Sequence, residues 1–332
     1  MNLTIRSYLA LRRSPGALGI TIAAGIGRVH LGGLGLATLL VARDATGSIA
    51  AAGLTAGAMS LGAAVTRPLQ GRLMDRAGVR PVLLGLIAAH VVAVAALVLA
   101  AGGGLTTAPL AALATAVGFT VPTLSVAIRA MWTQRFPDPS LRAAAFSSDI
   151  ATENAAFMLG PLLAGAVAAA SSPGAALVAL CLVGFGGTAY IAAVARPVPP
   201  RTAPRERAPR LARGLGPLAD ASFALGIGYG AVDVAAAARA LEHGNEAAAG
   251  ALVASLFAGG ALGALLLGVR GSDTAPRTRL LHRLGAFCLL AAALPPVPGI
   301  PALGVALFCA GTTLGPGLIS LLLNVAGGVP AE

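Results

Sequence analysis

The sequence predicts an all-α integral membrane protein with ten membrane-spanning helices, six before a polar linker and four after it. Hydrophobic residues make up 57% of the 332-residue chain and charged residues only 11%, whereas about 25% of a soluble protein is charged. The apolar residues lie in runs long enough for a helix of about 20 residues to cross a bilayer. The loops between these runs alternate between arginine-rich and nearly uncharged.

Ten apolar segments define the predicted spans. They cover residues 15–42, 47–69, 81–101, 106–131, 143–170, 174–195, 215–241, 246–269, 280–296 and 300–325. The first segment is too long for the apolar core of a signal peptide, and no small-residue cleavage site follows it. We therefore expect this segment to remain in the mature protein as a membrane span.

The arginines predict which loops face the cytoplasm. They gather before the first span and after the second, fourth, sixth and eighth, with Arg43 and Arg239 as the main exceptions. The connections at 101–107, 171–174 and 295–301 carry no charge. Short basic loops stay in the cytoplasm. We therefore expect a multi-pass protein of the cytoplasmic membrane with its N-terminus, and also its C-terminus, in the cytoplasm.

A segment rich in proline and arginine divides the predicted spans. Residues 196–214 contain six arginines and five prolines, a composition that cannot form a packed core and is typical of an extended, solvated linker. The sequence therefore predicts an N-terminal six-helix bundle at 1–195, a cytoplasmic linker at 196–214, and a C-terminal bundle of four spans at 215–332.

Composition excludes several other classes of function. The net charge is +11, and every basic residue is arginine, but no basic cluster alternates with aromatic residues that could stack on bases, so we expect no nucleic-acid partner. No catalytic nucleophile with an adjacent base is found, so we expect no enzyme. The cysteines Cys181, Cys288 and Cys309 show no metal-ligand spacing. They are predicted to be small buried hydrophobic residues, with no metal and no cofactor.

One specific motif follows the second span. Residues 71–83 read Gly-Arg-Leu-Met-Asp-Arg-Ala-Gly-Val-Arg-Pro-Val-Leu. This segment resembles the G-x-L-x-D-R-x-G-R-R-x-x-L signature of the major facilitator superfamily, and Val79 replaces an arginine of that pattern. The matching positions are Gly71, Leu73, Asp75, Arg76, Gly78, Arg80 and Leu83. The alternative is a basic loop that only sets the topology.

The chemistry of the motif residues gives further expectations. Gly71 would allow a helix end to approach a neighbour closely, and Gly78 would permit a turn that a side chain disfavours. Asp75 could cap a helix N-terminus or pair with Arg76 or Arg80. The resemblance to the superfamily implies that this loop is a latch between two bundles.

The resemblance also implies a fold and a class of function. It implies a secondary transporter with two six-helix bundles that alternate access to a central site, so a second bundle of four spans would be incomplete. Ten spans would also suit the drug/metabolite transporter fold, but the linker after span six argues against two repeats of five. A truncated membrane protein without transport activity is the rival from another class.

Ionisable residues inside predicted spans are the candidate substrate and proton pathway, because a charge in a membrane is costly and usually functional. They are Arg28, Arg129, Asp149, Glu153 and Asp233. Arg129 could instead anchor its helix at the cytoplasmic surface, and Asp149 could pair with Arg129. His30 and His90 are expected to be hydrogen-bonded packing residues.

These residues suggest a coupling mechanism. A carboxylate removed from water can bind and release a proton near neutral pH, so we expect Glu153 or Asp233 to carry a coupling proton, with Arg28 as an internal counter-ion. Gly160 and Pro161 begin a segment that weakly resembles the glycine–proline element of antiporters in the superfamily, although an ordinary proline kink would look the same. We therefore expect proton-coupled efflux of a small molecule, with proton-coupled metabolite uptake as the alternative.

Glycine spacing suggests an internal repeat. Gly53 and Gly57 in the second span have the same four-residue spacing as Gly259 and Gly263 in the eighth. Such pairs let helices pack closely in lipid. If the second half repeats the first with a period of six spans, the two pairs would be equivalent, but the high glycine content also produces such pairs by chance.

Overall fold

The computed structural model describes residues 5–195, 215–270 and 276–327, and the regular elements in these ranges are all helices. The chain divides into two compact units, Met1–Arg201 and Thr202–Glu332. The predicted linker at 196–214 lies outside the described residues.

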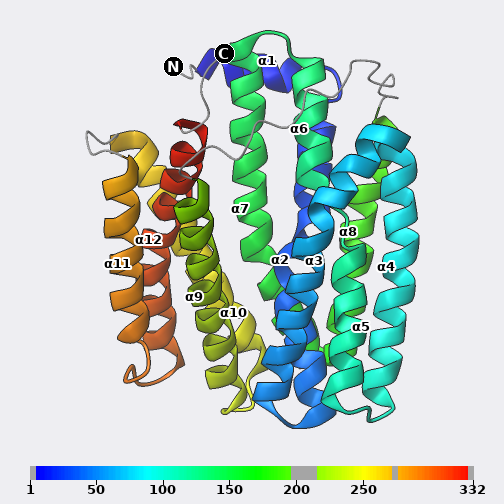
Figure 1. Cartoon of the computed structure of the whole chain (residues 1–332), viewed down its shortest axis with the longest axis vertical. Helices are drawn as coiled ribbons and strands as arrows, with labels where there is room; N and C mark the ends of the chain where they lie inside the picture. The colour runs from blue at the N-terminus through cyan, green and yellow to red at the C-terminus, as the bar shows by residue number, and fades with distance from the viewer. Residues whose placement is uncertain (1–4, 196–214, 271–275, 328–332) are drawn as a thin grey trace. The chain divides into compact units, whose positions relative to one another are not determined.

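The first unit contains eight helices in its described residues (Figure 1). They are α1 (Ile5–Arg13), α2 (Ala17–Thr46), α3 (Ile49–Ala77), α4 (Val79–Gly102), α5 (Thr107–Thr120), α6 (Leu124–Arg135), α7 (Pro139–Ala170) and α8 (Pro173–Val194). The long helix α2 packs along α7 and α8, α3 packs along α5, and α4 contacts α5 and α8.

The second unit contains four helices in its described residues. They are α9 (Leu215–Leu241), α10 (Glu246–Arg270), α11 (Pro276–Ala292) and α12 (Ile300–Gly327). The helix α12 packs along α10 and α11, and α9 contacts α10, α11 and α12.

Seven helical segments of the described residues are long and apolar enough to cross a membrane. They are Ala17–Thr46, Ile49–Ala77, Val79–Gly102, Thr107–Arg135, Ala144–Ala170, Pro173–Val194 and Glu246–Gly263, and Ile300–Thr313 is a shorter apolar helix. The protein is therefore an all-helical, multi-pass membrane protein. A helix occupies each of the ten predicted segments, and their assignment as ten spans remains a prediction.

Two helices of the first unit differ in detail from the predicted spans. The second span was predicted at 47–69, and α3 continues beyond it to Ala77, because arginine, glutamine and methionine are good helix formers that a hydropathy window does not detect. The fourth span was predicted at 106–131, and the segment Thr107–Arg135 that agrees with it is interrupted between α5 and α6. The broken helix borders the candidate site.

The connections of the first unit alternate between its two ends. The turn between α3 and α4 and the connection between α6 and α7 lie at the same end as α1, which contacts α7 (Figure 1). The connections α2–α3, α4–α5 and α7–α8 lie at the opposite end. The arginine-rich connections of this unit therefore share one end, as the alternation of charge in the sequence requires.

Glycines set the closest helix contacts in both units. A Cβ at Gly118 of α5 would be 2.9 Å from the backbone nitrogen of Ala63 in α3, and a Cβ at Gly311 of α12 would be 3.0 Å from that of Gly260 in α10. Real Cβ atoms are almost never found so close to a neighbour, so only glycine fits at these positions. The α3–α5 and α10–α12 interfaces are built in the same way.

The expected equivalence of the two glycine pairs is not supported at Gly57. No described atom lies within 4 Å of a Cβ placed at Gly57, whereas Gly259 and Gly263 pack against the backbone of α12 at Phe308 and Thr312. The contact of α3 with α5 uses Gly62 instead. The two units agree in which helices pair, α3 with α5 and α10 with α12, and the predicted equivalence does not hold at Gly57.

Candidate functional site

A buried ion pair joins α2 to α7. The guanidinium of Arg28 donates from Nη1 to Oδ1 of Asp149 at 2.6 Å and from Nη2 to Oδ2 at 3.1 Å. Both side chains are almost fully buried, with exposed fractions of 1% and 2%. Two parallel hydrogen bonds between a guanidinium and a carboxylate fix both groups in orientation as well as in charge. This pair is the electrostatic centre of the first unit.

Glu153 lies one helical turn after Asp149 and is held much less tightly. Its Oε2 is 3.9 Å from Nη2 of Arg28, beyond hydrogen-bonding distance, and 26% of its side chain is exposed. The same Nη2 donates to Oγ of Ser125 in α6 at 3.3 Å. The two carboxylates therefore differ: Asp149 is locked to Arg28, and Glu153 is only attracted to it.

A cavity of about 270 Å³ borders this cluster. Its lining combines charged groups from α2, α3 and α7 with apolar and hydroxyl groups from α2, α6, α7 and α8. The lining includes Arg28, His30, Arg67, Ser125, Glu153 and Phe157. A mixed lining with a few polar groups is typical of sites for small organic molecules. The cavity therefore offers both a charged wall and apolar surface to a ligand.

The break between α5 and α6 forms part of this cavity. Val121, Pro122 and Thr123 interrupt the helix and line the cavity. The side chain of Gln70 in α3 replaces the missing helical hydrogen bonds: its amide nitrogen donates to the carbonyl oxygen of Val121 at 2.8 Å, and its Oε1 accepts from the backbone N–H of Thr123 at 2.9 Å. Irregular backbone at membrane depth is tolerated where protein or a cavity surrounds it.

Sequence reasoning missed this break and the role of Gln70. Pro122 was the available signal, because proline lacks the N–H of a helical hydrogen bond and disfavours helix in the residue before it. The partner on α3 could not be recognised, since only the packing of α3 against α5 brings Gln70 to the break. Gln70 is also uncharged, so it is not one of the ionisable residues within the predicted spans.

Two expectations about charged residues need correction. Asp149 was considered as a partner of Arg129, but the structure pairs it with Arg28. Arg129 is exposed and does not line the cavity. Since α6 turns a different face to the interior, Ser125 contacts Arg28 and Arg129 points outward. The anchor interpretation of Arg129 is the one that agrees with its exposure.

Asp233 lies in the second unit, on α9. Its Oδ1 is buried without a hydrogen-bond partner among the described residues, and so is the hydroxyl of Tyr229 one turn earlier. The ring of Tyr229 lies edge-on to Phe257 of α10, with the ring centroids 5.5 Å apart. Among the described residues, Asp233 therefore has a polar neighbour on its own helix but forms no ion pair with a cation.

The motif at residues 71–83 is helical except for a single turn at Gly78. Gly78 has a φ of 88° and forms the only residue between α3 and α4, with its N–H donating to the carbonyl oxygen of Met74. Asp75, Arg76 and Arg80 are exposed. The expected cap by Asp75 is absent, because Gly78 and not Asp75 occupies the N-cap of α4.

Two further motif expectations fail within the described residues. Asp75 forms no ion pair with Arg76 or Arg80 there, because both arginines extend from the helix surface. Gly71 makes no close approach, since no described atom lies within 4 Å of a Cβ placed on it. Leu73 is half exposed, at 50% of its surface. The motif thus presents an exposed helical surface at the end of the first unit.

Gly160 and Pro161 lie at a tight helix crossing. Both residues are buried in α7, and Gly160 packs against the backbone of Gly33 and Val29 in α2. The glycine lets α7 come close enough for Asp149 to reach Arg28, two to three turns away along the same interface. This pair is therefore a packing element of the helix contact that positions the ion pair.

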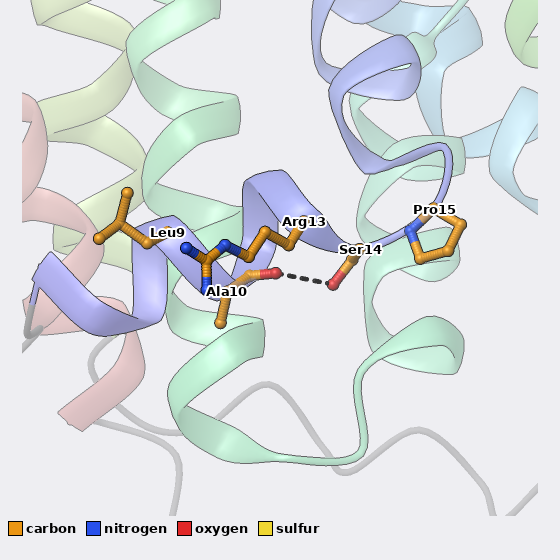
Figure 2. A pocket seen from close by; sticks show the side chains of 5 residues that line it. All are labelled: Leu9, Ala10, Arg13, Ser14 and Pro15. Carbon is orange, nitrogen blue, oxygen red and sulfur yellow. Dashed lines mark hydrogen bonds between the residues drawn. The ribbon is translucent and has the colours of Figure 1, made fainter.

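A second hollow lies beside α1 and the turn that leads into α2, with a volume of about 490 Å³. Figure 2 shows the residues that line it and the hydrogen bond from the Ser14 hydroxyl to the Ala10 carbonyl oxygen at 3.0 Å. They are Leu9, Ala10, Arg13, Ser14 and Pro15. Arg13 is the one ionisable side chain among them, so this hollow lacks the paired charges of the cavity at Arg28.

Comparison with known families decides the identity of the fold. The model of the Major Facilitator Superfamily matches residues 17–332. The chain belongs to this superfamily. Curated proteins give no match to the chain.

Membership in the major facilitator superfamily establishes a membrane transporter of this type, which implies a small-molecule substrate and a lipid bilayer. The superfamily consists of transporters rather than enzymes. In this major facilitator protein, the cavity lined by Arg28 and Glu153, beside the ion pair of Arg28 with Asp149, is the candidate site for its substrate or for a proton.

Proposed function

We propose that the protein exports a small molecule across the cytoplasmic membrane by alternating access, in exchange for protons that bind to Glu153. The contrast between the two carboxylates beside Arg28 carries this proposal. Asp149 is buried and both of its oxygens accept hydrogen bonds from Arg28, so it is fixed in the ion pair. Glu153 is 3.9 Å from the guanidinium and lines the cavity, so it is the carboxylate open to exchange with the cavity.

The geometry gives protonation a local consequence. An ionised Glu153 attracts Nη2 of Arg28, and a protonated Glu153 does not, which leaves that N–H to Ser125 and to the cavity. A substrate in the cavity therefore meets a different pattern of charge in the two protonation states. Such a difference is the requirement for coupling, because a ligand shifts an equilibrium only through its differential affinity for the two states.

The direction of transport and the second proton site are further parts of the proposal. Gly160 and Pro161 favour exchange over symport through their weak resemblance to the antiporter element. Asp233, with its unpartnered Oδ1, is the second candidate for a coupling proton. The exposed motif around Asp75 and Arg76 is proposed as the latch between bundles.

The test uses the full chain reconstituted into liposomes with an acidic interior and ethidium, a fluorescent amphipathic cation, as the probe outside. We expect proton-driven ethidium accumulation in the wild type and a loss of at least about tenfold in Glu153→Gln, because the amide cannot exchange a proton. Exchange of internal for external ethidium at equal pH should persist in Glu153→Gln, since the substrate site is retained.

Glu242→Gln is the matched control, because Glu242 is exposed after the end of α9 and should leave the proton-driven flux unchanged. If Glu153→Gln retains proton-driven accumulation, the assignment of the coupling proton to Glu153 is wrong, and if Asp233→Asn retains it as well, both candidates are excluded. Accumulation that requires an acidic exterior instead would show symport, and thus uptake. Absence of any ethidium flux in the wild type would contradict efflux of this class of compound.

A further inference from the structure

Two histidines and a cysteine meet in the first unit, outside the ion pair of the proposed transport mechanism. His30 lies on α2, His90 on α4 and Cys181 on α8, and all three side chains are buried. The Nε2 atoms of the two histidines are 3.0 Å apart. One ligand atom from each of the three residues lies within 4.8 Å of the other two.

This arrangement matches the donor set of a transition-metal site. Imidazole nitrogen and thiolate sulfur are the ligands of zinc and of monovalent copper. With zinc–nitrogen bonds of about 2.0–2.1 Å, two ligating nitrogens of a tetrahedral site lie about 3.4 Å apart. The observed 3.0 Å between the Nε2 atoms needs a movement of a few tenths of an ångström to admit an ion.

The surroundings of His90 hold its ring in the required orientation. The Thr120 hydroxyl donates to the carbonyl oxygens of Ala116 and Val117, so its oxygen accepts the N–H of His90 Nδ1 at 2.8 Å. The Nε2 of His90 is then the unprotonated nitrogen that faces His30. A metal-ligating histidine almost always donates its other N–H to such a partner, which fixes the tautomer and the ring.

An apolar wall and an opening complete the surroundings. The ring of Phe185, one turn after Cys181 on α8, lies 5.7–5.9 Å from the centroids of both histidine rings. On the other side, His30 lines the cavity of about 270 Å³ that borders Arg28. An ion could therefore enter from the cavity, and water in the cavity could supply a fourth ligand.

We propose that His30, His90 and Cys181 form a binding site for a thiophilic transition-metal ion of the zinc class, which cross-links α2, α4 and α8. Binding displaces the thiol proton of Cys181 to solvent and moves the shared imidazole hydrogen to Nδ1 of His30, so that both Nε2 atoms coordinate. His30 lines the same cavity as Glu153, but none of the three proposed ligands belongs to the ion pair or is the proposed coupling carboxylate.

The sequence conceals this site because its ligands come from three helices. His30 and His90 are separated by 60 positions and Cys181 by a further 91 in the printed sequence, so no short ligand spacing exists. Glycine brings the helices together: Gly184 of α8 packs against the side chain of His30, and Gly187 packs against Gly27 of α2. The packing of α8 on α2 therefore positions Cys181.

The test measures metal binding by the purified, metal-depleted chain in detergent. We expect equilibrium dialysis against micromolar Zn²⁺ to give one bound ion per chain. Co²⁺ as a spectroscopic probe should give a sulfur-to-metal charge-transfer band. Cys181→Ser, a nearly isosteric change that preserves the fold, should abolish this band and weaken Zn²⁺ binding by at least tenfold, since serine does not provide a thiolate.

Cys309→Ser and His243→Gln are the matched controls, because both residues are exposed and lie in the second unit. All three cysteines were predicted to be buried, but this holds only for Cys181, since Cys288 and Cys309 are exposed. The two control variants should bind Zn²⁺ and Co²⁺ as the wild type does. His90→Gln should also weaken binding, with circular dichroism and gel filtration to verify its fold. The proposal is overturned if the wild type binds no stoichiometric Zn²⁺, or if Cys181→Ser retains the affinity and the cobalt band. The three residues would then be packing groups only.

Discussion

Helix α2 of the first unit and helix α9 of the second each carry a buried ionisable group. The two groups differ in whether they have a partner. Arg28 of α2 has a carboxylate partner on α7, with two hydrogen bonds. Asp233 of α9 has a buried oxygen without a partner among the described residues. The helix α2 packs along α7 and α8, whereas α9 contacts α10, α11 and α12. A buried charge is neutralised only where a helix with the complementary group packs beside it.

The two units agree in another part of their packing. In the first unit α3 packs along α5, and in the second α10 packs along α12, each with a glycine against the backbone of its neighbour. This shared contact depends on small residues and backbone atoms, not on charge. The two units thus share a way of packing helices through glycine. They differ in that the described part of the first unit also contains a buried ion pair.

The largest expected effect comes from breaking the pair in the first unit. Asp149→Leu leaves the guanidinium of Arg28 buried without its bidentate partner, so we expect the free energy of unfolding to fall by about 3–5 kcal/mol. The double variant Arg28→Met/Asp149→Leu should recover most of this loss, because no buried charge remains. Denaturant unfolding in detergent measures both.

The same experiment on the second unit sharpens the contrast. Asp233→Leu removes a carboxylate with an unpartnered buried oxygen, so we expect no loss of stability, and an increase of up to about 2 kcal/mol. A loss for Asp233→Leu as large as that for Asp149→Leu would show that Asp233 has a strong partner. The contrast between a paired ionisable group in the first unit and an unpaired one in the second would then be wrong.

Glycine substitutions test the packing that the units share, with an intermediate effect. Gly118→Ala and Gly311→Ala place a methyl group against the backbone of the neighbouring helix, and each should cost about 1–3 kcal/mol. Gly57→Ala is the control, because open space surrounds that position, and alanine should stabilise the helix by up to about 1 kcal/mol. Thermal unfolding of the three variants gives the comparison; equal effects at Gly57 and Gly118 would refute the shared interface.

The smallest expected effect concerns a feature in which the units differ. The fourth segment is broken in the first unit, between α5 and α6, whereas α12 is continuous over 300–327. Gln70→Leu removes the hydrogen bonds to Val121 and Thr123, so we expect a loss of about 1 kcal/mol. Amide hydrogen exchange at Thr123 should become faster, while that of α12 stays the same. Unchanged exchange at Thr123 would show that Gln70 does not support the break.

Much of the helical architecture could be predicted from the sequence, because length and hydropathy decide whether a segment can cross a membrane. The first span was predicted at 15–42, and α2 covers Ala17–Thr46. The superfamily was recognised from the spacing of Asp75, Arg76 and Gly78, and the family match confirms it. Helix ends were less accurate, as at α3, because a helix continues beyond the bilayer wherever its residues favour it.

The partners within the candidate site could be predicted only in part. The i, i+4 spacing placed Asp149 and Glu153 on one face of a helix, which the structure retains. The choice of Arg28 over Arg129 as the partner depends on helix rotation, which a single sequence does not reveal. The cluster of His30, His90 and Cys181 depends on three helix contacts at once, so its members appeared unrelated.

The break at residues 121–123 separates two helices, α5 and α6, that pack mainly against different neighbours. The helix α5 packs mainly along α3 and α4, whereas α6 lies against α2, α3 and α7, and α2 and α7 carry the ion pair. The hydrogen bonds of Gln70 to Val121 and Thr123 attach the break to α3, and Ser125, which accepts a hydrogen bond from Arg28, lies just after it. One short piece of non-helical backbone thus connects the glycine contact at Gly118 with the neighbourhood of the ion pair.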